Sequence, residues 1–372
     1  MLIFERTFVS DYFALKDSKN MKSVVFYGFQ FAHHGDHSAF SALKKQLLRR
    51  KINVICALRP QFLWNRGVRR LLPIWMKLQE QRLNRFYNSD SIKSIHYFFP
   101  ENSLFNGHNK KGNKKLILTC HQPAKKETFD LLRNQNVSFI KGLKKADVIM
   151  LMASTGIEAY KKLAPQAKVI CIPHGIDVRF FNKKHATLRS QITSNRYNIL
   201  TVGNWLRDYE YWSDVVKELL KSGNEFSFNV IAGVDSHEKI KNAFKGSVPT
   251  EIKMHTGISD ESLRNHYAKA DILFLPLKDA WANNALLEAA AMECPVMVTN
   301  LPAVREYLGD DLALCFDRKY PIQTAQQIIK QLNNKQKMLR LGKKLRLRMI
   351  QHFSWEKIAD KYIQLYQELN CD

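Results

Sequence analysis

The residues around Glu288 include side chains that could bind an anion and a polyol. Ile272–Leu275 is a short apolar run, as expected for a strand buried in a parallel sheet. Asn283 or Asn284 can cap the helix that follows, and the unpaired amides at its start, near Ala285, would attract a phosphate. Glu288 lies four residues after Asn284, so both side chains share a helix face and could contact one ligand. Alternatively, Glu288 only solvates a surface helix.

A second candidate lies in the loop GNWLRDYE, which begins at Gly203 and follows an expected strand at Asn198–Val202. Arg207 is its one cation, and a guanidinium binds phosphate oxygens in a bidentate manner. Such a contact would stabilise negative charge that develops on a bound phosphate. The alternative is a surface arginine paired with Asp208.

Two further candidates lie in the first half of the chain. His121 follows an expected strand at Leu116–Thr119, and strand ends of this kind expose side chains to a cleft. A histidine there is alternatively a structural hydrogen-bonding residue. Gly35 follows an earlier strand and could let backbone amides approach a ligand closely. Beside it lie Asp36 and three histidines, but no metal-ligand spacing is completed elsewhere, so no metal is predicted; the histidines are His33, His34 and His37.

These candidates must be positioned by two series of alternating strands and helices, which predict an α/β fold with two Rossmann-like, doubly wound domains. The first series has strands at Val24–Tyr27, Ile52–Leu58, Leu116–Thr119, Val148–Met152 and Lys168–Pro173; the second has strands at Asn198–Val202, Phe226–Ala232, Ile252–His255, Ile272–Leu275 and Val296–Thr299. Predicted helices include one with Phe40, Leu43, Leu47 and Leu48 on one face, one capped by Ser154 or Thr155, and ones at Tyr211–Leu220, Asp260–Ala268 and within 321–349. The expected domains are residues 1–185 and 190–352, with 353–372 crossing back to the first.

The composition is that of a globular chain. A length of 372 residues favours two domains. No run of eighteen apolar residues predicts a transmembrane helix, and Glu5 and Asp11 at the amino terminus fit no secretory signal. The six cysteines form no C-x-x-C pair and are expected to be reduced. The prediction is a cytoplasmic protein.

The stretch that contains Glu288 resembles the donor-site signature of glycosyltransferase family 4, whose members are retaining enzymes with the GT-B fold. That signature has two glutamates separated by seven residues, then a small-residue helix and a Pro-Val strand; here the second half is matched by Glu288, Ala289 to Ala291, Pro295 and Val296. Ala280 stands where the family has its first glutamate, and Asp279 is the nearest acid. Either the loop is one residue longer and Asp279 takes that role, or the acidic contact is missing.

Weaker similarities extend from about Val24 to Leu369. The Gly35 loop resembles the family's amino-terminal glycine loop, and His121 resembles a histidine beside the donor sugar. The segment with Gly203, Asn204 and Arg207 resembles the one that grips the donor diphosphate, although Asn204 replaces a basic residue. Ile258 lies where the family holds the nucleotide base. His174 replaces a usual asparagine, and the closing sequence HFSWEKI resembles the family's crossover helix.

The resemblance implies two domains that face each other across a cleft, with the donor bound by the second. Asp279 and His121 would orient the sugar, and Glu288 would anchor the ribose. The implied reaction is sugar transfer from a UDP-, GDP- or ADP-linked donor, with retention and without a metal or another cofactor. The expected acceptor is a glycan, a lipid-linked molecule or another component of the cell envelope.

The net charge of +24 is concentrated in the first half of the chain, where residues 1–190 hold 34 Lys and Arg against 12 Asp and Glu. Residues 44–86 are especially basic and are interleaved with apolar residues such as Phe62, Trp64, Ile74 and Trp75. This mixture is typical of a surface that binds an anionic membrane, which would place the protein peripherally at the inner face. Alternatively, the apolar residues form a core and the charges are solvated.

Three other functions compete with sugar transfer. A nucleotide-sugar epimerase, or a binding protein without catalysis, would keep the same fold. A basic nucleic-acid-binding protein is more remote: the charge could neutralise phosphates, but the sequence contains no recognisable nucleic-acid-reading module, so no nucleic-acid partner is expected.

Overall fold

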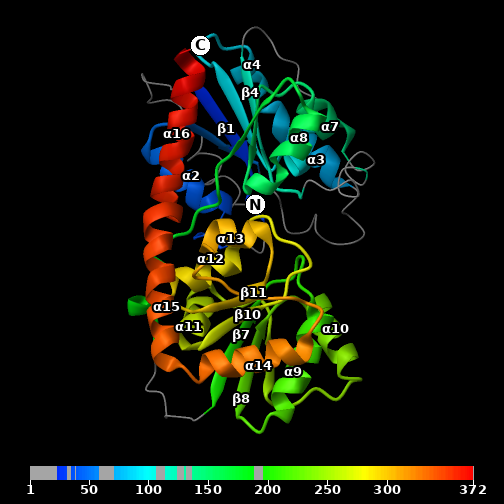
Figure 1. Cartoon of the computed structure of the whole chain (residues 1–372). Helices are drawn as coiled ribbons and strands as arrows, with labels where there is room; N and C mark the ends of the chain where they lie inside the picture. Colours follow the sequence, from blue (N-terminus) through cyan, green and yellow to red (C-terminus); the bar gives the residue numbers. More distant parts are fainter. Residues whose placement is uncertain are drawn as a thin grey trace, which may run out of the picture.

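Two parallel sheets of six strands each organise the chain (Figure 1). The computed structural model describes residues 23–31, 35–37, 39–57, 71–105, 114–123, 130, 136–187 and 196–371. Each sheet has helices on both faces, and the two sheets lie one above the other in the view of Figure 1. The predicted α/β fold with two doubly wound units is therefore confirmed.

The first sheet has the order β2-β1-β3-β4-β5-β6. Its strands are β1 (Val24–Gly28), β2 (Asn53–Cys56), β3 (Ser94–Phe98), β4 (Lys115–Cys120), β5 (Val148–Leu151) and β6 (Lys168–Cys171). The helices between them are α2 (Ala39–Arg49), α3 (Leu72–Gln81), α4 (Asn84–Tyr87), α5 (Pro100–Ser103), α7 (Val137–Leu143) and α8 (Ile157–Leu163), with 3-10 turns at Ser154–Gly156 and Lys183–His185. Because β2 and β3 flank β1, the strand order reverses between β1 and β3, where α/β sheets bind ligands.

The second sheet has the order β12-β11-β10-β7-β8-β9. Its strands are β7 (Tyr197–Val202), β8 (Phe226–Ile231), β9 (Ile252–His255), β10 (Ile272–Leu275), β11 (Val296–Thr299) and β12 (Leu314–Phe316). Its helices are α9 (Tyr209–Lys221), α10 (Val234–Ala243), α11 (Asp260–Lys269), α12 (Asn284–Ala291), α13 (Pro302–Leu308), α14 (Pro321–Leu332) and α15 (Lys335–Arg348). The order reverses between β7 and β10.

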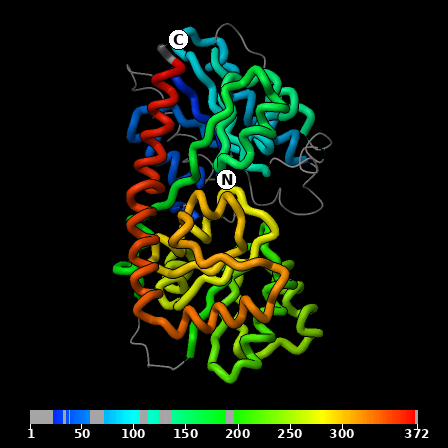
Figure 2. The backbone as a smooth tube through the Cα atoms, in the orientation of Figure 1, coloured from blue at the N-terminus to red at the C-terminus, as the bar shows by residue number. Residues whose placement is uncertain are grey.

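The end of the chain connects both sheets. Beyond α15, a π-helical turn (Met349–Phe353) leads into α16 (Trp355–Cys371). Figures 1 and 2 show α15, in orange-red, beside the lower half of the molecule and α16, in red, beside the upper half. Ile176 of the linker pairs with this crossing, because its N–H donates to Phe353 O (2.8 Å) and its carbonyl accepts from Trp355 N (3.1 Å). Farther along, Tyr366 bonds His96 of β3 (2.6 Å). No helix within the described part of the chain is long and apolar enough to cross a membrane.

Several predicted elements need correction. The helical region expected within 321–349 is two helices, because Asn334 interrupts it and caps α15 by accepting from Lys337 N. The helix expected to be capped by Ser154 or Thr155 begins as a 3-10 turn without a side-chain cap. Leu48, expected on the apolar face of α2, is 45% exposed.

Candidate functional site

The loops after β7 and β10 meet at the point where the order of the second sheet reverses. Arg207 and Leu277 form an isolated antiparallel bridge. Asp208 N donates to Pro276 O (3.0 Å), and Lys278 N donates to Leu206 O (2.8 Å). The two loops therefore support each other at the carboxyl ends of adjacent strands, where parallel sheets bind ligands.

Arg207 is held by three hydrogen bonds to neutral groups. Its Nε donates to Val202 O (2.9 Å), Nη1 to Trp205 O (2.8 Å) and Nη2 to Asn283 Oδ1 (3.2 Å). A guanidinium has five N–H groups, so one on each Nη remains for a ligand. Burial lowers the pKa of Arg207, but an arginine stays protonated in proteins. The side chain is thus a fixed positive charge beside the start of α12.

The alternative interpretation, in which Arg207 is a surface arginine paired with Asp208, is wrong. Asp208 instead caps α9 by accepting from Tyr211 N (3.2 Å), and its other oxygen pairs with Arg318 (2.5 Å). Asn204, at the position of a basic residue in the signature, accepts hydrogen bonds from Gly233 N (2.5 Å) and Ser236 Oγ (3.0 Å). It therefore connects the loop after β7 to the one after β8.

The start of α12 resolves the choice between two capping residues. Asn283 is the N-cap, and its Oδ1 accepts from both Leu286 N (3.3 Å) and Arg207 Nη2. Asn284 is the first helical residue, and Ala285, also in the first turn, is buried. Arg207 and the helix start thus share one side-chain oxygen, which brings a cation and the positive end of a helix together.

Glu288 is not the solvated surface residue of the alternative reading. Its side chain is 6% exposed, and its Oε2 accepts from the Tyr267 hydroxyl of α11 (2.9 Å). The pKa of Glu288 is raised to about 7, chiefly by burial and also by Asp260, while the Tyr267 hydrogen bond and Arg207 limit the rise. At neutral pH this carboxyl group therefore exists in both protonation states, and it is charged more readily when it gains donors.

Asp279 and its neighbours form the loop between β10 and α12. Asp279 is half-buried, and its Oδ1 accepts from Ala280 N (2.9 Å). Ala280 and Trp281 are buried, and a Cβ added at Gly156 of the first sheet's domain would overlap the Trp281 ring. The role of Asp279 as the displaced acid stays a prediction.

The loop that carries Gly35 lies against α11 of the other sheet's domain. A Cβ at Gly35 would overlap the Asp260 carboxylate, so a glycine is needed for this close approach. Burial raises the pKa of Asp260, which His37 and the Asp36 N–H counteract. Since Asp260 also acts electrostatically on Glu288, Gly35 lies near the group formed by Glu288, Tyr267 and Arg207.

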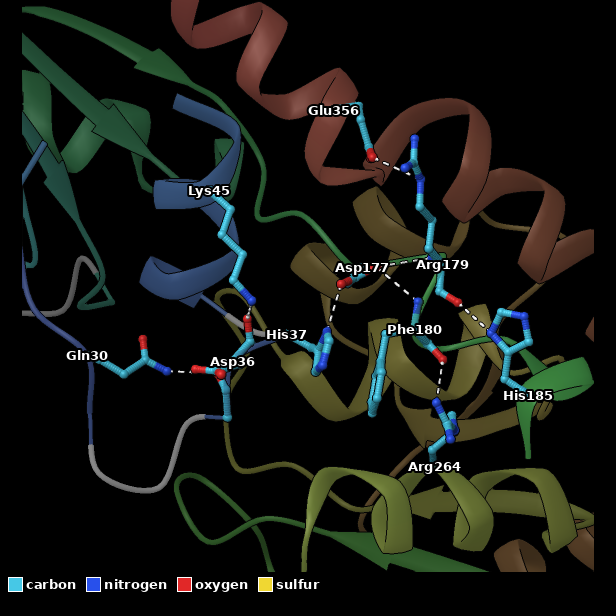
Figure 3. A network of polar contacts seen from close by, with 11 residues as sticks. Gln30, Asp36, His37, Lys45, Asp177, Arg179, Phe180, His185, Arg264 and Glu356 are labelled. Carbon is cyan, nitrogen blue, oxygen red and sulfur yellow. Dashed lines mark hydrogen bonds and ion pairs between the residues drawn. The ribbon is translucent and has the colours of Figure 1, made fainter. Parts of the chain in front are cut away.

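A clasp of three stacked groups holds the two domains and their linker together at this point; we define it as His37, Phe180 and Arg264 (Figure 3). The His37 ring stacks on the Phe180 ring with centroids 3.6 Å apart, and the Arg264 guanidinium lies 4.5 Å from the same ring. His37 Nδ1 lies 2.9 Å from Asp177 Oδ2, and the other oxygen of Asp177 accepts from Phe180 N (3.0 Å). His33 and His34 are outside the described residues.

His121 lies at the end of β4, as expected, and its described contacts are within the first domain. Its ring lies against Phe99 with centroids 3.7 Å apart and meets Phe98 edge-on at 4.5 Å. Its Nδ1 lies 3.0 Å from Thr119 O. Because a carbonyl only accepts, Nδ1 carries the hydrogen, and Nε2 of the neutral ring has the lone pair. A role beside the donor sugar stays a prediction.

The remaining predicted donor contacts lie on the second sheet's domain. Ile258 is half-buried in the turn after β9, next to Gly257, which has φ +62°. Gly203 has φ +102°, and a Cβ there would be 2.5 Å from Arg207 Nη2, so the glycine makes room for the guanidinium. Within the parts of the chain that the structure describes, no group of three or more His, Cys, Asp or Glu side chains could hold a metal ion.

Sequence reasoning missed Asp260 and Tyr267, which both act on Glu288. They are seven residues apart on α11 and therefore share a face with Arg264, four residues after Asp260. This periodicity was visible in the sequence as a polar face with one tyrosine. The contact of this face with Glu288 on α12 could not be predicted, because no local sequence pattern tells which helices pack together.

The basic stretch of residues 44–86 divides into two groups. Met76, Leu83 and Phe86 are buried in the core, so for them the membrane interpretation is wrong. Leu71, Ile74 and Leu78 are 47–57% exposed and lie on one face of α3 and the residue before it. Residues 58–70, including Phe62 and Trp64, are outside the described residues.

Known proteins are similar to this chain in sequence over one region and in fold over most of its length. Residues 196–334 match the family model described as "Glycosyl transferases group 1". The fold is similar to an α,α-trehalose 6-phosphate synthase from Burkholderia multivorans, at TM-score 0.72 and 11% identity over 94% of this chain and 99% of that one. It is also similar to a sucrose-phosphate synthase from Thermosynechococcus elongatus, at TM-score 0.70 and 16% identity over 93% and 99%.

A third similar structure is the trehalose-6-phosphate protein of E. coli bound with UDP-2-fluoro glucose, at TM-score 0.72 and 12% identity over 92% of this chain and 99% of that one. A search of curated proteins finds no significant match by sequence. At these identities the similar structures establish the GT-B fold, while the family match covers the part of the chain that holds Arg207 and Glu288.

Proposed function

We propose that the chain is a glycosyltransferase of the GT-B type that transfers a sugar from a nucleotide-sugar to a glycan or lipid-linked acceptor, with retention at the anomeric carbon and without a metal ion. The observation that carries this proposal is the hydrogen bond between Arg207 and Asn283, which joins a fixed cation to the start of α12. A diphosphate bound there would meet two N–H groups of Arg207 and the first amides of the helix.

The energetics favour catalysis at this point. Departure of a nucleoside diphosphate develops negative charge, and a preorganised donor at such a position contributes about 3 to 4 kcal/mol to lowering the barrier. Arg207 is preorganised because three of its N–H groups are already bonded to the protein. The guanidinium therefore needs little reorganisation when the charge appears.

Glu288 would bind the ribose hydroxyls, and Asp279 and His121 would orient the transferred sugar. The Tyr267 hydroxyl bonds Glu288 Oε2. A carboxylate accepts more than one hydrogen bond, so a ribose diol can add to that contact. Ile258 and the neighbouring backbone would contact the base, for which UDP, GDP and ADP are the candidates.

The test is a thermal-shift panel of nucleotide-sugars, followed by assay of the hit with candidate acceptors. A donor at one hundred times its dissociation constant adds about 2.7 kcal/mol of stability. UDP-sugars come first, since one similar structure holds UDP-2-fluoro glucose. Glu288→Ala should abolish the shift, whereas Glu293→Ala, a half-buried glutamate just beyond the end of α12, should retain it.

Three outcomes decide the proposal. Nucleotide release that requires an acceptor supports transfer. A shift with conversion of the sugar but no nucleotide release would mean an epimerase. Absence of any nucleotide-sugar shift, together with salt-sensitive binding to duplex DNA, would replace the proposal by nucleic-acid binding.

The exposed face of α3 supports a peripheral membrane location. Leu71, Ile74 and Leu78 form an exposed apolar strip, and Lys77 on the same helix and Arg85 on α4 are exposed as well. Each basic residue near an anionic leaflet contributes about 1 kcal/mol. Ile74→Glu with Leu78→Glu should therefore reduce flotation with phosphatidylglycerol vesicles, while Ile322→Glu with Leu339→Glu, equally exposed on the other domain, should not. Equal flotation of the two double variants would exclude this surface.

A further inference from the structure

A buried carboxyl group lies directly beneath the end of β4. The one-turn helix α5 follows β3 through Phe99, whose φ of +62° turns the chain sharply. This turn brings Glu101 to β4, where its Oε1 accepts from His121 N (2.5 Å). The side chain is 4% exposed, and the Glu101 carbonyl accepts from Asn136 Nδ2 (3.0 Å). Glu101 is thus fixed at both its backbone and its carboxyl group.

His121 is consequently fixed at three points. Glu101 binds its backbone N–H, Thr119 O binds its ring at Nδ1, and the Phe99 ring supports its face. Phe99 belongs to the same turn that carries Glu101, so one local structure positions both the backbone and the ring. These bonds select the tautomer whose Nε2 has the lone pair.

The free-energy cost of burying the Glu101 carboxyl group indicates that this residue has more than a structural role. Glu101 Oε2 is buried and makes no well-formed hydrogen bond within the described part of the protein, although the Gln122 N–H also acts on the carboxyl group. Leaving a carboxyl oxygen buried without a partner is unfavourable. A glutamine could accept the same N–H with its carbonyl and would not bear a buried charge. The presence of a buried carboxyl group at this position therefore points to a use for its negative charge.

We propose that Glu101 is a positioning residue for sugar transfer, which acts through His121 by fixing the end of β4 and by placing a negative charge behind the imidazole. This inference rests on the proposed function, because it takes His121 as the group that meets the transferred sugar. Glu101 itself does not touch the substrate. Its charge favours any positive charge that develops on the sugar side of the histidine.

The surroundings of Glu101 should make its charge, and therefore kcat, depend on pH. Burial raises the pKa of Glu101 to about 7, while the N–H groups of His121 and Gln122 lower it. Among the described residues, the titratable groups that face it besides His121 are Cys120 on β4 and Tyr160 on α8. Burial raises the pKa of both well above the ordinary value, so both are neutral between pH 5 and 9. Protonation of Glu101 below pH 7 removes its charge and weakens its bond to His121.

The experiment compares the full-length wild type with Glu101→Gln, Glu101→Ala and the control Glu80→Gln. Glu80 is also a buried glutamate of the first domain and accepts from Tyr97 OH (2.9 Å) and Phe105 N (2.9 Å). At pH 8 we expect kcat to fall about 3- to 10-fold in Glu101→Gln and 10- to 100-fold in Glu101→Ala, with the donor KM within about threefold. The wild-type decline in kcat below pH 7 should disappear in Glu101→Gln and persist in Glu80→Gln.

Identical pH profiles of kcat in the wild type and Glu101→Gln would overturn the inference. If Glu101→Ala does not fold, the comparison of Glu101→Gln with the wild type still tests the inference. A second readout does not require turnover: NMR of the His121 ring carbons should show an inflection near pH 7 in the wild type that Glu101→Gln lacks. If no nucleotide-sugar is turned over, the proposed function fails, while this inflection still tests the coupling. A His121 signal that does not respond to Glu101→Gln overturns the coupling itself.

Discussion

Both domains contain a buried glutamate near the carboxyl ends of their strands, Glu101 in the first and Glu288 in the second, and burial raises the pKa of both to about 7. They differ in their partners. Glu288 receives a hydrogen bond from a side chain, the Tyr267 hydroxyl, and faces a cation, Arg207. Glu101 receives backbone N–H groups and lies against a histidine and neutral side chains.

This difference separates two ways of building a site. In the second domain, side chains from three elements converge and leave donors and acceptors for a charged ligand. In the first domain, one turn fixes the backbone of its neighbour, and the polar groups are mostly used within the protein. We infer that the second domain supplies binding energy for the donor, while the first supplies geometry.

Loss of the cation should have the largest effect. Arg207→Gln removes the positive charge at the diphosphate position but can retain some of the hydrogen bonds to the loop. We expect kcat/KM for the donor to fall about 100- to 1000-fold, the range observed for loss of one preorganised donor. The matched control is Arg318→Gln, because Arg318 pairs with Asp208 on the same loop without bonding Asn283. Comparable losses in both variants would mean that Arg207 acts only by supporting the loop.

The different construction of the two sites also explains how much of each could be predicted from the sequence. Strands β9, β10 and β11 have the predicted bounds, because short runs such as ILFL carry their burial in the residue pattern. Strand β3 was missed: His96 lies at its centre and is buried because Tyr366 and Thr119 bond both ring nitrogens. Glu288 was identified from its own motif. The bond from Glu101 to His121 joins residues twenty positions apart, and no local pattern specifies it.

A second test asks whether the position of Arg207, and not only its charge, matters. A Cβ at Gly203 would lie 2.5 Å from Arg207 Nη2, and φ is +102°. Gly203→Ala should therefore displace the guanidinium and lower kcat/KM about 10- to 100-fold. Gly246→Ala is the control, since φ is +84° there with no atom within 4 Å of the added Cβ. It should cost about 1 kcal/mol of stability without loss of activity. Equal activity in both alanine variants would contradict a fixed guanidinium.

The pH dependence of donor binding should distinguish the two glutamates. Binding of ribose hydroxyls favours the charged form of Glu288, so donor affinity should fall about tenfold from pH 8 to pH 6. Glu288→Gln should bind weakly at both values, whereas Glu101→Gln should keep the wild-type dependence. Isothermal titration calorimetry at the two pH values measures this. A dependence that follows Glu101 instead would reverse the assignment of binding to the second domain.

The raised pKa of Glu288 also determines whether the ligand-free protein gains or loses stability as the pH rises. The folded pKa of Glu288, about 7, lies above its ordinary value of 4.5. Its contribution to the free energy of unfolding is therefore fully present below pH 4.5 and is lost as the pH rises through 7, by about 3 kcal/mol in total. Urea unfolding at pH 5 and pH 8 should show a smaller difference for Glu288→Gln than for the wild type.

The smallest effect is expected at the clasp, which holds the two regions in register without contacting the reacting groups. Phe180→Ala removes the ring that separates His37 from Arg264, while the backbone bonds to Asp177 can remain. Because the Gly35 loop would lose the stacking of His37 on Phe180 but keep its bonds to Gln30, Lys45 and Asp177, we expect the donor KM to rise about two- to fivefold with little change in kcat. Arg179→Ala is the control: its side chain lies on the same linker but pairs with Glu356 of α16. A larger effect on kcat than on KM would show that the clasp positions His121 as well as the donor site, and the division between binding and geometry would then no longer follow the domain boundary.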